Sequence, residues 1–352
     1  MKYILGIEST AHTFGVAVLD WDGKILSNVK DAYTTESGGM IPIEVRKHHK
    51  EVASELFNKA LSESGIIEED IEVVAFSNAP GLAPCLLEGM KFTKDTAKRL
   101  DIPVVSVNHC VAHLEIGDLV GASDPVMLYA SGANTQIIAY EAGKYRVFGE
   151  TLDLGVGNFI DTFARYAGLG FPGGPKIQKL AEESKLAARG IPSELETSKE
   201  VSSLSGKDEL IDLPYSIKGM DVAFSGMQTK LRVLLDKGVD IKDLSYSMQE
   251  VVFAMLVEAS ERALAHTGKK ELLLGGGVAC NSRLQEMCKI MCKERGVKYF
   301  CPGKSLLLDN PAMIGYLGLK MYRSGMFFKS SELGKVDIYP RQRTDDVKVT
   351  WK

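Results

Sequence analysis

The sequence lacks the markers of several large protein classes. It contains no run of about 18 apolar residues, so no membrane-spanning helix is expected. A carboxylate at Glu8 interrupts the segment that a signal peptide would keep apolar. The six cysteines include no CxxC pair, which favours reduced thiols over a disulfide framework. The pattern GxxxxGK[ST] is absent, which excludes a P-loop NTPase. We therefore expect a cytoplasmic protein with no membrane partner.

An excess of basic residues is also missing. The formal net charge is −4, which argues against a surface that coats nucleic acid over its whole extent. The densest basic run covers residues 46–50, and it fits either a local positive patch or one solvated face of a helix. The length of 352 residues and the hydrophobic content of 45% predict a soluble chain with two domains or one large duplicated fold.

Both halves of the chain open with the same pattern. It consists of a strand, a turn of small or hydroxyl residues, a strand, a glycine turn and a third strand. The predicted strands are residues 2–6, 14–19 and 24–28 in the first half and 126–130, 136–140 and 145–148 in the second. Each opening is followed by helical patterns and a further buried strand, at 73–77 and at 271–274. Helices are predicted at 43–64, 86–100, 158–168, 175–189, 245–266 and from about 281.

This repetition predicts a duplicated α/β fold of the actin-like ATPase type, found in the actin, hexokinase and Hsp70 superfamily. Two facing α/β domains would hold a nucleotide in the cleft between their turns. We expect a first half over residues 1–124, a second half over 125–330 with an insertion near 191–221, and an extended tail over 331–352. Two unrelated α/β domains with similar openings are the alternative.

Four clusters of small residues in the second half suit the close approach of a nucleotide. Residues 131–135 offer backbone N–H groups at a turn, and 155–158 lead into a helix that carries Asp161. The Asp161 carboxylate is able to accept from two ribose hydroxyls. Residues 172–175 form a glycine-lined wall, and 275–277 with Asn281 precede a helix N-terminus. Each is weak alone, because each is also an ordinary turn or helix start, but together they favour nucleotide binding.

A pair of histidines, His109 and His113, predicts a metal site. Their i, i+4 spacing places both imidazoles on one face of a helix, although two ordinary buried histidines would show the same spacing. Asp309 is expected at the end of an apolar strand over residues 306–308, and Tyr129 at the end of the strand that opens the second half. Such ligands suit iron or zinc. The glutamate of HExxH is absent between the histidines, which disfavours a metallopeptidase.

The sequence resembles the tRNA N6-adenosine threonylcarbamoyltransferase family along nearly its whole length. The resemblance rests on motifs at residues 6–12, 78–86, 107–115, 129–135, 172–175, 276–281 and 309–312. Residues 213–221 and the tail around 340–351 resemble the archaeal and eukaryotic branch, in which the protein is the catalytic subunit of the KEOPS complex.

The resemblance implies a reaction: transfer of threonylcarbamoyl from threonylcarbamoyl-AMP to the N6 amine of the adenosine next to the anticodon, in tRNAs that read ANN codons. It implies one Fe²⁺ per subunit, or Zn²⁺, on the residues His109, His113, Tyr129 and Asp309. It also implies an ATP or adenylate site on the residues Tyr129, Ala130, Ser131, Gly132, Ala133, Asp161, Gly174, Gln178 and Asn281. Position 178 is usually acidic in the family, whereas the amide of Gln178 would accept from a ribose hydroxyl without carrying a charge.

The implied partners are tRNA and three KEOPS subunits: a small kinase-like ATPase, a dimerising subunit and an accessory subunit. Glu8, in the first turn, is the candidate base for the attacking amine, and a structural carboxylate is the alternative. Two other functions remain open on the same fold. A small-molecule kinase would not need the histidines, and a nucleotide-driven scaffold would modify no tRNA.

Overall fold

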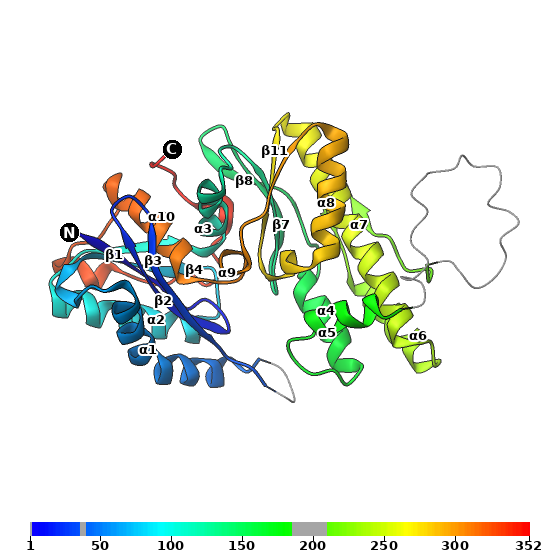
Figure 1. Ribbon diagram of the computed structural model, residues 1–352, viewed down its shortest axis with the longest axis horizontal. Coiled ribbons are helices and arrows are strands. Elements are labelled where there is room, and N and C mark those ends of the chain that lie inside the picture. Colours follow the sequence, from blue (N-terminus) through cyan, green and yellow to red (C-terminus); the bar gives the residue numbers. More distant parts are fainter. Residues whose placement is uncertain (1, 36–39, 185–209) are drawn as a thin grey trace, which may run out of the picture.

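The computed structural model describes residues 2–35, 40–184 and 210–352, and it arranges them as two α/β halves that face each other (Figure 1). The first sheet has the strand order β3-β2-β1-β4-β5. Its strands are β1 (Tyr3–Glu8), β2 (Thr13–Asp20), β3 (Ile25–Ala32), β4 (Ile71–Ala79) and β5 (Val104–Asn108). The hairpin strands β1, β2 and β3 are antiparallel, whereas β4 and β5 run parallel to β1.

The second sheet repeats this topology in the order β12-β11-β6-β7-β8. Its strands are β6 (Val126–Ala130), β7 (Thr135–Glu141), β8 (Lys144–Glu150), β11 (Glu271–Gly275) and β12 (Lys298–Phe300). Here too the three hairpin strands are antiparallel, and β11 and β12 run parallel to β6. The predicted duplication is therefore confirmed, because each strand of one sheet has its counterpart in the other.

The first sheet is covered on both faces, and the alternation of side chains along β1 shows how. Leu5 and Ile7 belong to a core cluster with residues of α1 (Pro42–Ser64), which packs beside α2 (Ala83–Leu100). Ile4 points the other way, into a cluster with Ala312 of α10 (Pro311–Arg323). The short helix α3 (His109–Glu115) contacts α10 on this second face.

Helix α10 lies in the range that we expected for the second half, yet it packs on the first sheet, against β1, β2 and β4. Gly6 makes this approach possible. A Cβ atom at this position would lie 2.3 Å from the carbonyl oxygen of Pro311. The glycine in the middle of a buried strand thus marks the place where another backbone comes close.

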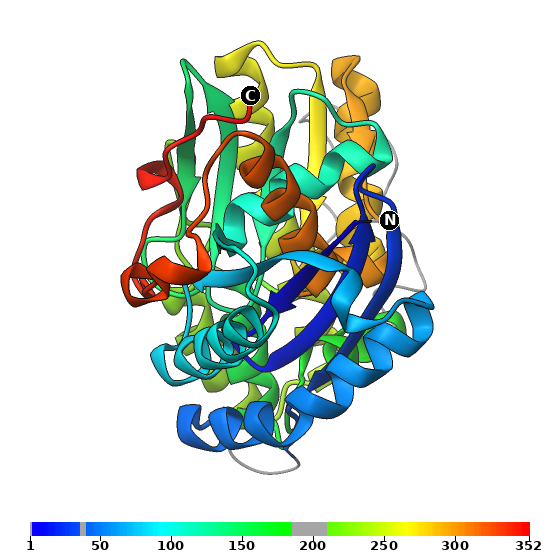
Figure 2. The ribbon, with the colours of Figure 1, turned by 90° about the vertical axis from the view of Figure 1, so that its left-hand side faces the viewer.

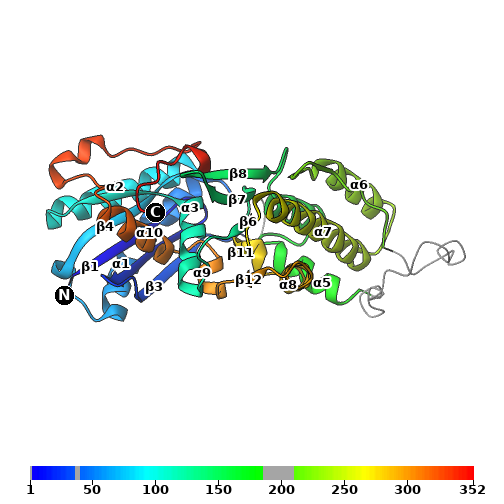
Figure 3. The ribbon, with the colours of Figure 1, turned by 90° about the horizontal axis from the view of Figure 1, so that it is seen from above.

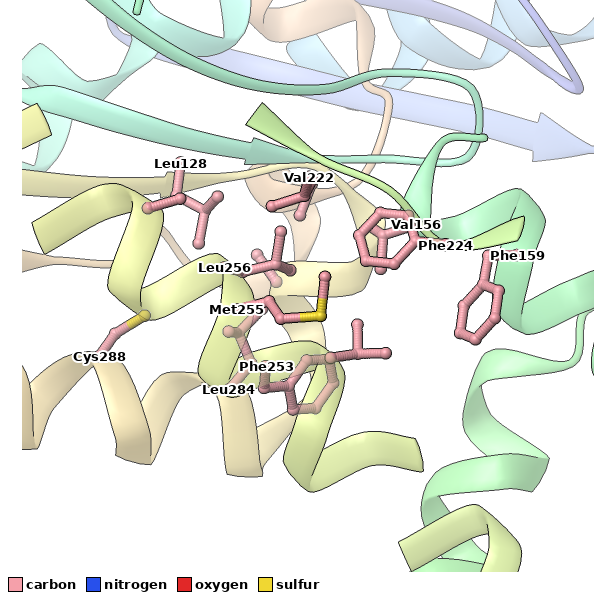
Figure 4. Packing of buried hydrophobic residues seen from close by; sticks show 14 of the residues in the cluster. Leu128, Val156, Phe159, Val222, Phe224, Phe253, Met255, Leu256, Leu284 and Cys288 are labelled. Atoms are coloured by element: carbon pink, nitrogen blue, oxygen red, sulfur yellow. The ribbon is translucent and has the colours of Figure 1, made fainter. Parts of the chain in front are cut away.

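The helices of the second half are α4 (Val156–Tyr166), α5 (Gly174–Glu182), α6 (Ser225–Asp236), α7 (Ile241–Thr267) and α8 (Ser282–Arg295). Figure 4 shows their core, in which the rings of Phe159 and Phe224 stack with centroids 5.4 Å apart. Helix α6 was not predicted. The predicted helix at 175–189 ends at Glu182, and its residues 185–189 lie outside the described residues. Residues 191–209 of the expected insertion also lie outside the described residues. Its remaining residues, 210–221, include β9 (Ile217–Lys218) and the first residue of β10 (Asp221–Val222), which together form a small hairpin.

The segment that leads to Asp309 differs from the prediction. Residues 306–308 were expected to form a strand, but Leu306 and Leu307 belong to the short helix α9 (Lys304–Leu307) and Leu308 follows it. An apolar run of three residues carries no periodicity that separates helix from strand. Seen from above, α3 and α9 lie where the two halves meet (Figure 3).

The tail has little regular structure. It includes the 3₁₀ turns η5 (Ser330–Lys335) and η6 (Thr344–Asp346) and otherwise runs along the side of the molecule (Figure 2). Among the described residues, no helix is both long and apolar enough to cross a membrane.

Candidate metal centre and adjoining cleft

Helix α3 presents the two predicted histidines. It begins directly after β5, where the Asn108 side chain accepts a hydrogen bond from the backbone N–H of Val111 at 3.2 Å. This N-cap fixes the start of the helix. His109 and His113 are one turn apart and almost completely buried, with ring centroids 4.8 Å from each other. The predicted helix and the common face of the two imidazoles are therefore present.

Asp309 and Tyr129 reach the histidines from other parts of the chain. Asp309 Oδ1 lies 3.3 Å from His109 Nε2 and 3.5 Å from His113 Nε2. The hydroxyl of Tyr129, on β6, lies 3.1 Å from His109 Nε2. One ligand atom from each of His109, His113 and Asp309 falls within 4.8 Å of the others. The structure thus brings together all four residues that were predicted to bind the metal.

The donor atoms of this group fit a divalent cation. Neither ring nitrogen of His113 has a hydrogen-bond partner, although both are buried. A buried polar atom without a partner costs free energy, on the order of 1–3 kcal/mol. A metal ion bound to Nε2 would remove that cost at this nitrogen. Two imidazoles and one carboxylate with open positions are the ligand type of non-haem iron and of catalytic zinc.

Glu8 lies behind His109 and does not line the cleft described below. Its carboxylate is fully buried, and its Oε2 accepts a hydrogen bond from His109 Nδ1 at 2.9 Å. The other oxygen, Oε1, accepts from the backbone N–H of Thr10 at 2.7 Å and from the Thr10 hydroxyl. This arrangement fixes the tautomer of His109 and leaves Nε2 free for a metal. It corresponds to the alternative that the sequence left open, a structural carboxylate, more closely than to a base that meets substrate.

The electrostatics of the group favour a cation. Burial would lower the pKa of His109, but the carboxylates of Glu8 and Asp309 outweigh burial and hold this pKa well above its usual value. Burial opposes ionisation of Asp309 as well, yet the two imidazoles hold its pKa well below the usual value. Burial lowers the pKa of His113 and raises that of Tyr129. The carboxylates therefore favour a positive charge here, either a proton or a metal ion.

A cavity of about 930 Å³ adjoins the group and is lined by both halves. Leu308, next to Asp309, and Gly132, three residues after Tyr129, belong to its wall. The predicted nucleotide-site residues that line it are Gly132, Asp161, Gly174, Gln178 and Asn281. The remaining predicted residues, Tyr129, Ala130, Ser131 and Ala133, are not part of this wall.

The residues outside the wall lie on β6 and in the turn that follows it. Tyr129 belongs to the metal group, and Ala130 is buried in the sheet. Ser131 closes the turn, because its backbone N–H donates to the carbonyl of Asn134 at 2.9 Å. Gly276 lets the next loop approach this turn. It has a φ of +89°, and a Cβ there would lie 2.4 Å from the carbonyl oxygen of Ala130.

Three of the wall residues are already held by neighbours. Asp161 accepts from the backbone N–H of Gly173 at 2.7 Å, and burial raises the pKa of its carboxyl. Gln178 donates to the hydroxyl of Ser282 at 3.0 Å. The Asn281 side chain caps α8, accepting from the backbone N–H of Arg283 at 2.9 Å, and donates to Gln249 at 2.8 Å. These contacts orient side chains at the mouth of the cavity.

Two residues of the first half were not predicted from the sequence: one lines the cleft and the other holds the loop of a metal ligand. His12 lines the cleft, with its ring edge-on to Phe171 at 6.1 Å between centroids. The half-buried ammonium of Lys30, on β3, donates to the carbonyl oxygen of Asp309 at 2.7 Å and so holds the ligand loop. His12 belongs to the family motif at residues 6–12, which is the signal that could have identified it. No local pattern distinguishes Lys30.

Comparison with known proteins identifies the family. The sequence matches the family described as TsaD, tRNA N6-adenosine threonylcarbamoyltransferase, over residues 24–316. The chain belongs to this family. The tRNA N6-adenosine threonylcarbamoyltransferase of Thermococcus kodakarensis is 48% identical over 348 residues, which are 99% of each chain. A "probable bifunctional tRNA threonylcarbamoyladenosine biosynthesis protein" of Methanosarcina mazei is 47% identical over 353 residues, covering 99% of this chain and 59% of that protein.

Solved structures with much lower identity confirm the fold. HypF of T. kodakarensis superposes with a TM-score of 0.55 at 14% identity, over 94% of this chain and 49% of that one. Component A of the Acidaminococcus fermentans (R)-2-hydroxyglutaryl-CoA dehydratase gives 0.51 at 14%, over 95% and 100%. The chain is therefore an actin-like member of a tRNA-modifying transferase family, as its motifs predicted.

Proposed function

We propose that this TsaD-family chain transfers the threonylcarbamoyl group of threonylcarbamoyl-AMP to the N6 amine of the adenosine next to the anticodon, in tRNAs that read ANN codons. The observation that carries the proposal is the position of the metal group, His109, His113 and Asp309, directly beside a cavity that both halves line. An acyl donor in the cavity would lie next to the metal group, because Leu308, which directly precedes Asp309, belongs to the cavity wall. The family match gives tRNA as the acceptor.

The cavity suits the adenylate part of the donor, or ATP. Its volume of about 930 Å³ is at the upper end of small-molecule sites, which leaves room for an acyl group beside the nucleotide. Gly132 and Gly174 would present no side chain to a base or ribose, and the Asp161 carboxylate in the wall would accept from ribose hydroxyls. The amide of Gln178 offers a further acceptor without charge.

One Fe²⁺ per subunit is the proposed metal, with Zn²⁺ as the alternative, held by His109, His113, Asp309 and Tyr129. When bound, the ion would act as a Lewis acid on the carbamoyl oxygen and as a template for the donor. The chain itself orients the ligands: Glu8 holds the His109 ring and Lys30 holds the loop of Asp309. In the transfer, the N6–C bond forms and the bond from carbon to the phosphate oxygen breaks. AMP leaves with the electron pair, and the amine loses one proton.

Much of the tRNA affinity would come from partner subunits. Part of the basic run at 46–50 is engaged within the chain: Arg46 pairs with Glu88 at 3.1 Å, His48 contacts Asp31 at 2.7 Å, and His49 is buried. The exposed Lys47 and Lys50 leave only a small positive patch. Membership of a KEOPS complex, with a kinase-like ATPase, a dimerising subunit and an accessory subunit, would supply the missing positive surface. The M. mazei relative supports a partner with a second activity, because that protein is longer than the part matched by this chain and its name calls it bifunctional.

The test uses the purified chain with its three proposed partners, tRNA and a source of threonylcarbamoyl-AMP. Label from threonine should enter tRNA, and Asp309→Ala should abolish the incorporation. Asp346→Ala, an exposed carboxylate of the tail, is the matched control and should leave it unchanged. If tRNA stays unlabelled with all partners present, or if Asp309→Ala retains activity, the proposed reaction is wrong.

A further inference from the structure

The last residues of the chain, 339–352, contact both halves, and we refer to this segment as the strap. It begins on the first half, where the Tyr339 N–H donates to the carbonyl of Asn78 at 2.9 Å and the Gly81 N–H donates to the carbonyl of Pro340 at 3.2 Å. These bonds attach it at the end of β4 and the start of α2, on the side of α3.

The strap then crosses to the second sheet. Arg343 pairs with Glu150, at the end of β8, at 3.2 Å. The Thr344 hydroxyl donates to the Gln136 side chain, on β7, at 3.0 Å, and Thr344 itself is buried. Val347 is also buried, in the cluster that contains residues of both sheets. The strap is therefore packed onto both halves, and its contacts are not confined to exposed side chains.

Between and beyond these anchors the strap contacts both ends of α3. At the start of the helix, the N-cap residue Asn108 donates through Nδ2 to Gln342 Oε1 at 3.2 Å. At its end, Lys352 Nζ lies 3.0 Å from Oε1 of Glu115, a fully buried carboxylate that also pairs with Lys320. The rings of Trp351 and Tyr145 pack beside this pair with centroids 6.3 Å apart.

Helix α3 needs such support. It has seven residues, too few for a helix to be stable on its own propensity, so its position depends on tertiary contacts. These are the packing of its buried residues against α10 and the contacts at its two ends. His109 and His113 are both on it, and a metal site tolerates displacement of its ligands by only about 0.5 Å.

We infer that the strap positions the metal-binding helix, and that Gln342 and Lys352 are positioning residues for the metal ligands His109 and His113. This inference rests on the metal centre of the proposed function. It adds that the geometry of the centre depends on a segment that contributes no ligand to it. A change in the strap should therefore alter metal binding without touching a donor atom.

The experiment compares the unchanged chain with the double variant Gln342→Leu/Lys352→Met. Zn²⁺ affinity is measured by competition with a chromophoric chelator, and the visible spectrum of the Co²⁺-loaded protein reports ligand geometry. We expect a loss of Zn²⁺ affinity of roughly tenfold, at the lower end for groups that orient metal ligands, and a shifted Co²⁺ spectrum. Lys348→Met removes an exposed lysine of the same strap and should change neither.

The single variant Lys352→Met should lose Zn²⁺ affinity, whereas Lys352→Arg keeps a cation beside Glu115 and should retain it. This pair gives a comparison even if the double variant folds poorly. An unchanged affinity and an unchanged Co²⁺ spectrum in a double variant that merely melts earlier would overturn the inference, since the strap would then only stabilise the fold. If the unchanged chain binds neither Zn²⁺ nor Fe²⁺, the proposed metal centre itself is refuted. If it binds Zn²⁺ and the variants bind equally well, only the strap's role is refuted.

Discussion

Replacing Glu8 by glutamine should weaken metal binding and should leave the chemical step intact once metal is saturating. The carboxylate now accepts on both sides, from His109 Nδ1 at 2.9 Å and from the Thr10 N–H at 2.7 Å. An amide is not able to do both. If its NH₂ group faces Thr10, two donors meet in a buried place. If it faces His109, Nδ1 must become an acceptor, and the ring proton moves to Nε2, the nitrogen that faces the metal.

The magnitude follows from these two arrangements. A buried donor without an acceptor costs on the order of 1–3 kcal/mol. If this cost falls on the metal-bound form, affinity drops by roughly tenfold to a hundredfold, the range seen when a partner of a ligating histidine is removed. The side-chain volume is nearly unchanged, so packing around position 8 should not contribute.

The assay separates positioning from base catalysis. Zn²⁺ affinity is measured first, and threonylcarbamoyl transfer is then measured as a function of added metal. We expect Glu8→Gln to need more metal and to reach nearly the unchanged maximal rate. If metal affinity is normal while the rate stays low at saturating metal, Glu8 takes part in proton transfer and the positioning role is wrong.

Two further predictions concern stability. The buried ring of His49 has a pKa of about 4, because burial disfavours its charged form, so the stability it contributes is complete above about pH 6.5 and is lost as the pH falls toward 4. Urea unfolding should show that the free energy of unfolding of the unchanged chain falls by about 2 kcal/mol between about pH 7.5 and about pH 5. His49→Gln should lack this loss, and the control His266→Gln, at an exposed site, should keep it. Equal losses in all three proteins would contradict the prediction. Gly6→Ala should destabilise the chain by about 1–3 kcal/mol, because its Cβ would lie 2.3 Å from the Pro311 carbonyl oxygen. Gly226→Ala, which meets no atom within 4 Å, is the control, and equal unfolding free energies for the two variants would exclude the steric reason.

Local patterns predicted the fold well. Each half opens with a hairpin whose strands and turn residues are neighbours in the sequence, so the pattern was visible without knowledge of any long-range contact. The final helix was different. Nothing in the pattern of α10 tells which sheet it covers, and the local hints were Gly6 and Gly15, glycines inside buried strands.

The candidate site, like the fold, was predictable where it depends on residues that are close in the sequence. The spacing of His109 and His113 is a local property of a helix, and the structure confirms their common face. Glu8 was assigned by its place in a turn, yet its partner is His109, 101 positions away, so its role depends on tertiary structure. The strand predicted before Asp309 was wrong for a related reason, because a short apolar run does not specify its own conformation.

The packing of α10 on β1 also has a consequence for the order of folding. Ile4 and its neighbours on the inner face of the first sheet find their cover only when residues near Pro311 have been synthesised. Until then an apolar face is exposed to solvent and to other chains, which is the condition under which nascent proteins aggregate or engage chaperones. Asp309 lies two residues before the first residue of this helix, so a ribosome-bound chain would acquire the last of its four proposed metal ligands in the same late step that closes the first half. The metal would then be loaded at the end of synthesis, onto a nearly finished protein.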